Sequence, residues 1–130
     1  ARSDMRGARL LLCGIAGSYI AGPAVGEVVE VSSELCTELP ERFRVEYRNT
    51  PCTKLRSVRS ATVHRTEKPF CGVEIENMEG AALFALAEAM GIRVAEIRAV
   101  SNRVGEPFAE WRVEEAIEAL ADVLSKLEFE

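Results

Sequence analysis

The chain has 130 residues, of which 48% are hydrophobic and 28% are charged. This length and composition are typical of one globular domain with its own core. The net charge of −5 and the lack of a lysine and arginine cluster argue against a nucleic-acid-binding protein. No apolar run reaches the roughly 20 residues of a membrane span, and the first residues lack a signal-peptide pattern. We therefore expect a cytoplasmic domain with no membrane partner.

Cysteine and histidine usage limits the metal chemistry that the chain can support. The four cysteines, Cys13, Cys36, Cys52 and Cys71, are widely and irregularly spaced, and the chain has one histidine. A zinc site needs four such ligands at regular spacing, so free thiols in a reducing compartment are the better interpretation. We expect no metal and no cofactor.

The first half of the chain predicts short strands separated by turns. Residues 10–13 form an apolar run that predicts a buried strand, and residues 14–19 (G-I-A-G-S-Y) predict a strand-to-loop transition. The two glycines allow the backbone there to turn or to approach a ligand, and the residues alone favour a turn. Further strands are predicted at residues 27–31, 43–48, 57–66 and 73–75. One of them carries His64, and a lone histidine in a strand is more often a surface residue than a catalyst.

Residues 76–91 predict a helix with polar residues at its start. Asn77 is a candidate N-cap and Gly91 a candidate C′ residue. The apolar positions at helical spacing are Ala81, Ala82, Leu83, Leu86, Ala87 and Met90. Glu79 would share their face, where the helix dipole favours a carboxylate but burial demands polar partners. A simple first-turn capping role explains Glu79 equally well.

The rest of the chain predicts a strand and one packing helix. Residues 94–100 form the strand, and Ser101 and Asn102 end it. Asn102 would lie where open α/β sheets bind ligands, facing the same crevice as Glu79, although an ordinary turn asparagine fits as well. The last helix has apolar residues at Val113, Ala116, Ile117, Leu120, Leu124 and Leu127. The order of elements predicts an α/β domain, a mixed β-sheet flanked by helices in three layers.

Two motifs, E-N-M-E-G-A-A (residues 76–82) and E-I-R-A-V-S-N (residues 96–102), resemble the nucleoside phosphorylase and nucleosidase superfamily. Within it the likeness is greatest to the futalosine hydrolases, relatives of the methylthioadenosine/S-adenosylhomocysteine nucleosidases. Residues 14–19, 25–34 (V-G-E-V-V-E-V-S-S-E) and 62–67 (T-V-H-R-T-E) agree in order. The resemblance implies a nucleoside phosphorylase-like fold over residues 1–130, truncated because the first strands of the family are missing.

The resemblance also implies a purine nucleoside site. The residues that it assigns to substrate binding are Ala16, Gly17, His64, Asn77, Met78, Glu79 and Ser101. Glu79 and Asn102 take the catalytic roles, since Glu79 would hold the ribose hydroxyls and Asn102 would stabilise charge on the departing base. The adenine-cleaving relatives carry aspartate at the latter position. An amide suits a 6-oxopurine such as hypoxanthine.

The reaction that the resemblance implies is hydrolysis of the N-glycosidic bond of futalosine, releasing hypoxanthine in menaquinone biosynthesis. No residue of the chain matches the glutamate with which the family activates water. A catalytically silent nucleoside-binding or oligomerisation module is therefore the alternative. A phosphorylase is a weaker one, because the sequence has no basic phosphate clamp. The relatives pair through this domain, which implies a homodimer.

Overall fold

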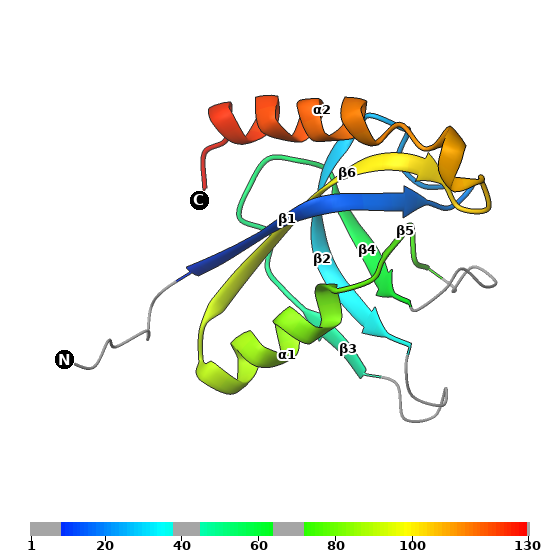
Figure 1. The fold of residues 1–130 in the computed structure, drawn as a ribbon. Helices are drawn as coiled ribbons and strands as arrows, with labels where there is room; N and C mark the ends of the chain where they lie inside the picture. The colour runs from blue at the N-terminus through cyan, green and yellow to red at the C-terminus, as the bar shows by residue number, and fades with distance from the viewer. Residues whose placement is uncertain (1–8, 38–44, 64–71, 130) are drawn as a thin grey trace.

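A computed structural model describes residues 9–37, 45–63 and 72–129 of the chain (Figure 1). Within these ranges the elements, in chain order, are β1 (Arg9–Ser18), β2 (Val28–Cys36), β3 (Val45–Arg48), β4 (Ser57–Thr62), β5 (Ile75–Asn77), α1 (Gly80–Met90), β6 (Arg93–Arg103), a 3-10 helix (Phe108–Glu110) and α2 (Val113–Lys126). His64, Cys71 and residues 43–44 of the predicted third strand lie outside the described ranges.

The strands form one mixed sheet in the order β3-β2-β4-β5-β1-β6. β2 also pairs with β6, so the sheet curls back on itself. Helices α1 and α2 lie on opposite sides of the strands (Figure 1). These features confirm the predicted α/β class with a mixed sheet between helices.

The parallel pairing of β1 with β6 brings together residues 14–17 and 98–102, which come from two of the predicted motif regions. The two strands run side by side from the pair Arg9 and Arg93 to the pair Ser18 and Arg103. β1 therefore continues to Ser18, so the strand-to-loop transition predicted for residues 14–19 is complete only at its last residue, Tyr19. The backbone hydrogen bonds to β6 hold those residues extended, with one irregularity in register between Ala16 and Gly17.

Helix α1 is rotated relative to the prediction. Its buried residues are Gly80, Ala81, Phe84 and Ala87. Ala82, Leu86 and Met90, which were predicted to face the core, are exposed. The ring of Phe84 enters an apolar cluster with Ile92 and Val94 and so sets the rotation. Gly91 ends the helix with φ of 67°, a left-handed conformation that glycine adopts without strain, as predicted.

Helix α2 packs on the other side of the sheet, mainly against β6. Ala116 and Leu120 are buried against Ile97 and Ala99, and Leu124 of the helix and Leu127 just after it lie at the edge of this cluster. Ile117 was predicted to face the core but is 53% exposed, because it lies beside the buried stripe. In the part of the chain that the structure describes, no helix combines the length and apolar character needed to cross a bilayer.

Candidate nucleoside site

A cavity of about 190 Å³ opens where β1, β5 and β6 meet the start of α1. Its lining residues are Ile15, Ala16, Gly17, Glu76, Asn77, Met78, Glu79, Ser101, Asn102 and Trp111. All the residues predicted for the site line it, apart from His64, which lies outside the described residues. The two motifs that resemble the superfamily therefore meet around one cavity.

The strand register explains why these residues meet. Gly17 of β1 lies opposite Glu76 of β5 on one side and opposite Asn102 of β6 on the other. A Cβ atom added to Gly17 would lie 3.2 Å from both Nδ2 of Asn102 and Cγ2 of Val104. Because glycine has no side chain, position 17 leaves room for the Asn102 amide in the wall of the cavity.

Short contacts fix the orientation of the Asn102 amide. Its Oδ1 accepts a hydrogen bond of 2.8 Å from the Ser101 hydroxyl, and its Nδ2 donates to the Arg103 carbonyl at 3.1 Å. An asparagine amide carries two N–H groups. Among the described residues one of them has no acceptor and remains available to a ligand. Asn102 lies inside the end of β6, not after the strand as predicted.

Met78 and Glu79 form the segment between β5 and α1. The prediction that Glu79 shares the buried face of α1 is wrong, because its side chain is 56% exposed. The helix begins at Gly80, so Glu79 itself holds the N-cap position, and Asn77 lies two residues before it. The Asn77 side chain still performs a capping role, since its Oδ1 accepts the N–H groups of Glu79 at 3.0 Å and Gly80 at 2.7 Å.

Arg98 is the residue behind the cavity that the sequence reasoning missed. It is 1% exposed, and its Nη1 lies 2.6 Å from Oε1 of Glu79. Nη1 also donates to the Ile15 carbonyl, and Nε donates to Oε2 of Glu96 at 2.7 Å. Burial alone would lower the pKa of Arg98, but the carboxyl groups of Glu96 and Glu79 raise it. The alternation of Glu96 and Arg98 within an apolar strand was the available signal.

A buried polar cluster continues behind Arg98. It consists of Glu34, Ser60, Thr62, Asn77 and Glu96. Both oxygens of Glu34 accept hydrogen bonds, at 2.6 Å from Nδ2 of Asn77 and at 2.7 Å from the Thr62 hydroxyl. The Thr62 hydroxyl in turn accepts the N–H of Ala81 in the first turn of α1. The cluster therefore ties the helix start to β2 and β4.

Glu76, the second carboxyl group that lines the cavity, is also engaged. Its Oε1 accepts a hydrogen bond of 2.9 Å from the Tyr19 hydroxyl. Burial and the neighbouring Glu76 raise the pKa of Tyr19 well above its usual range. Tyr19 therefore stays a neutral donor, and Glu76 was not recognised from the sequence as part of the site.

Metal-binding side chains do not gather in the described part of the chain, where no group of three or more histidines, cysteines, aspartates or glutamates is placed to hold an ion. The described cysteines Cys13, Cys36 and Cys52 are free thiols. The buried Cys52 lies against the carboxyl group of Glu30, which accepts its N–H at 2.9 Å.

A family model and a solved structure are similar to this chain. Residues 65–127 match the model of the phosphorylase superfamily. A solved structure of MTAN from Chlamydia trachomatis, bound to MTA, superposes with a TM-score of 0.73 at 15% sequence identity, covering 91% of this chain and 63% of that one. The chain thus shares the fold of that structure, as the resemblance predicted, over less than two thirds of the structure's length.

Two curated relatives of this chain are futalosine hydrolases. The chain is 29% identical to the futalosine hydrolase of Thermus thermophilus, covering 92% of this chain and 68% of the relative. It is 47% identical to the futalosine hydrolase of Streptomyces coelicolor over 57 residues, which cover 43% of this chain and 24% of the relative. These matches confirm the resemblance to futalosine hydrolases.

Proposed function

We propose that this chain binds a purine nucleoside in the cavity between β1, β6 and the start of α1 and takes part in hydrolysing its N-glycosidic bond. We further propose futalosine as the substrate and hypoxanthine as the departing base. The observation that carries the proposal is the meeting of the Glu79 carboxylate and the Asn102 amide at one cavity. The similarity to two futalosine hydrolases supports the choice of substrate.

Glu79 is the proposed ligand for the sugar. Arg98 engages its Oε1, so Oε2 remains to accept hydrogen bonds from ribose hydroxyls. The bond to the guanidinium restricts the torsions of the Glu79 side chain, which prepares the acceptor before the sugar arrives. Met78 is exposed next to Glu79 and would pack under the sugar ring. Ala16 and Gly17 supply the backbone wall opposite.

Asn102 is the proposed ligand for the base. Its free N–H can donate to a purine ring nitrogen or to the oxygen of a 6-oxopurine, and the Ser101 hydroxyl holds the amide in that orientation. Negative charge gathers on the base as the glycosidic bond breaks. A donor fixed in advance stabilises that charge without reorganising, which is the main way such a site lowers a barrier.

The remaining features of the proposal concern the whole molecule. We propose one nucleosidase-like domain, a cytoplasmic location and a role in menaquinone biosynthesis. We also propose a homodimer. Free cysteines suit a reducing compartment. The exposed apolar side chains Leu86 and Met90 on α1 suit a self-association surface.

The direct test is incubation of the purified chain with futalosine, with hypoxanthine release followed by chromatography. Glu79→Gln and Asn102→Ala should each lower the rate by about tenfold or more, since each removes one charged or aligned contact. Glu88→Gln is the matched control, because Glu88 is an exposed glutamate of α1 that does not line the cavity. Absence of hypoxanthine at high protein concentration would reject the proposal that the chain hydrolyses futalosine.

A second candidate function is nucleoside binding without turnover. The observation that favours it is the state of the carboxyl groups lining the cavity: Glu79 is paired with Arg98 and Glu76 with Tyr19. If the free Oε2 of Glu79 holds the ribose, as proposed, and Glu76 keeps its bond to Tyr19, no carboxylate among the described lining residues is left to activate water. Calorimetry with inosine separates the cases, because binding without hypoxanthine release supports this function, and no binding rejects it.

A further inference from the structure

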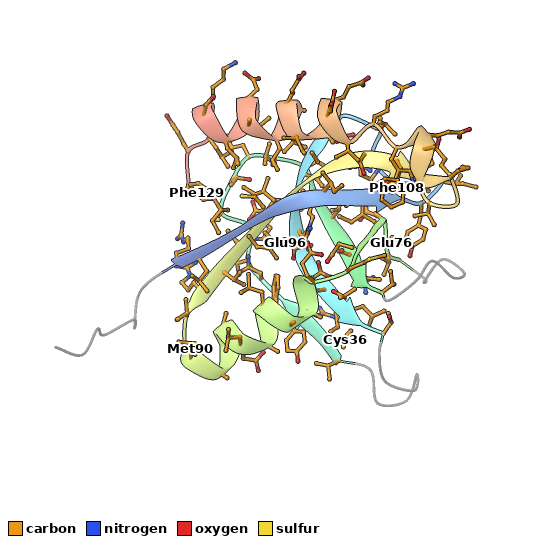
Figure 2. The ribbon with its side chains drawn as sticks, viewed as in Figure 1. Cys36, Glu76, Met90, Glu96, Phe108 and Phe129 are labelled. Carbon is orange, nitrogen blue, oxygen red and sulfur yellow. The ribbon has the colours of Figure 1, made fainter. Side chains whose placement is uncertain are left out.

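The buried polar cluster places two carboxyl groups against each other. Glu34 of β2 and Glu96 of β6 are both fully buried. A Cβ atom added to Gly80 would lie 2.5 Å from Cδ of Glu34 and 3.0 Å from Oε2 of Glu96. The two carboxyl groups therefore lie next to each other under the first residue of α1, and Figure 2 labels Glu96 in the interior of the molecule, among the strands.

The hydrogen bonds around Glu96 are incomplete if it is ionised. Its Oε2 accepts from Nε of Arg98 at 2.7 Å, but its Oε1 is buried and has no donor among the described residues. Leaving a buried acceptor unpaired is costly. A proton on Glu96 turns its carboxyl group into a donor, and the neighbouring carboxyl group of Glu34 offers the acceptor, so protonation lets the two groups bond to each other.

The charges around Arg98 lead to the same conclusion. The carboxyl groups of Glu79 and Glu96 both bond to the Arg98 guanidinium, and Glu34 lies beside Glu96. Two carboxyl groups buried side by side resist ionising together. Burial first, and then the charge of Glu34, raise the pKa of Glu96 to about 9, although Arg98 acts in the opposite direction. Glu34 from β2 and Arg98 from β6 itself are the titratable groups that act on Glu96. The carboxyl group of Glu79 raises the pKa of Arg98. Burial raises the pKa of the Cys13 thiol in β1, and the charge of Arg98 opposes that increase.

We propose that Glu34 and Glu96 share a single proton, and that Glu96 is a positioning residue that holds Arg98 and, through it, the Glu79 carboxylate in the nucleoside site. The second part rests on the proposed function. The bonds to Glu96 and Glu79 come from two different nitrogens, Nε and Nη1, of one planar guanidinium, so fixing the first orients the second. Glu79 is half exposed and depends on this bond for its orientation.

Two substitutions at position 96 distinguish a protonated Glu96 from an ionised one. A glutamine has the shape of a protonated glutamic acid, so Glu96→Gln keeps an acceptor for Arg98 and a donor for Glu34. Glu96→Leu removes both. If Glu96 were an ordinary carboxylate paired with Arg98, the two variants would both lose the ion pair and behave alike.

The first experiment measures inosine affinity by calorimetry, and the kcat and KM of futalosine hydrolysis, between pH 6 and 9.5. We expect Glu96→Gln to stay within about threefold of the wild type at pH 7, and Glu96→Leu to bind about tenfold or more weakly. Wild-type affinity should fall as pH approaches 9, because a second buried negative charge draws Arg98 away from Glu79. Glu96→Gln should lack this fall. Equal losses in both variants, or the same pH profile in wild type and Glu96→Gln, would overturn the proposal.

The second experiment does not depend on nucleoside binding. In protein labelled with ¹³C at glutamate Cδ, one resonance should titrate well above pH 7 in the wild type and be missing in Glu96→Gln. The Nε–H resonance of Arg98 should exchange slowly in both proteins. If the wild type binds neither inosine nor futalosine, the proposed function fails, while these spectra still decide the shared proton and the fixing of Arg98. The absence of a high-pH titration, or a fast-exchanging Arg98 Nε–H, would overturn the inference.

Discussion

Gly80→Ala tests the contact between α1 and the buried carboxyl groups. A methyl group at position 80 would overlap the carboxyl group of Glu34, at 2.5 Å from its Cδ, and crowd Oε2 of Glu96 at 3.0 Å. Glu34 is fully buried and makes hydrogen bonds to Thr62 and Asn77, so it cannot move into solvent. The substitution must therefore displace either the start of the helix or the carboxyl group.

The expected loss of stability can be worked out from these contacts. Overpacking a close-packed site costs about 1–3 kcal/mol, and losing one hydrogen bond to a charged group costs about 1.5–3 kcal/mol. Alanine is a better helix former than glycine by about 1 kcal/mol, which offsets part of the loss. We expect Gly80→Ala to lower the free energy of unfolding by about 2–5 kcal/mol.

Urea denaturation followed by circular dichroism measures this change, with the denaturant slope checked for a constant value. Ala82→Gly is the control, because Ala82 is exposed on the same helix and should lose only the propensity difference of about 1 kcal/mol. A Gly80→Ala protein as stable as the wild type would show that no carboxyl group lies under the first turn of α1, and would refute the reasoning.

Three further predictions follow from other contacts. Because the folded protein keeps a proton on Glu96 that the unfolded chain releases near the ordinary pKa of 4.5, stability should fall as pH rises from about 4.5 to 9. The fall reaches up to about 1.4 kcal/mol per pH unit; urea denaturation at pH 6 and 8 should show a flatter dependence for Glu96→Gln, and equal slopes would contradict the shared proton. Thr53→Val removes a hydroxyl that donates to the buried Glu30 and should cost about 1.5–3 kcal/mol by thermal denaturation, whereas Thr50→Val on the surface should change little. Phe84→Ala should cost about 3–5 kcal/mol in the same assay through the cavity that it leaves, and a loss no larger than that of an exposed control would contradict its core position.

The strands were predictable because their apolar runs and bounding turns are local signals. The parallel partner of β1 was not predictable from residues 10–19, so the glycines at positions 14 and 17 suggested a loop. They lie in the strand because β6 supplies hydrogen bonds along its whole length. The curling of the sheet through the pairing of β2 with β6 was equally invisible, since it depends on contacts far apart in the sequence.

The rotation of α1 and the role of Arg98 escaped prediction for different reasons. Nearly every residue of α1 is apolar, with Glu88 as its one charged residue, so helical spacing could not distinguish the buried face. The buried face is set by the ring of Phe84, which packs into the cluster with Ile92 and Val94. Arg98 looked like an isolated charge in a strand, and its meaning depends on Glu79 and Glu96 converging on it in three dimensions. The motifs located the cavity lining, while the support behind it needed the structure.

The curled sheet has a consequence for association between chains. Every described strand except β3 has a neighbour on each side, because β2 closes the row from β4 round to β6. β3 is four residues long and carries Glu46 and Arg48. A short, charged edge is a poor template for a foreign strand. Among the other described strands the pairing is complete for part of the length only, since β5 meets β1 at just Gly17 and Ser18, so an incoming strand would find open backbone on the earlier part of β1 rather than on β3.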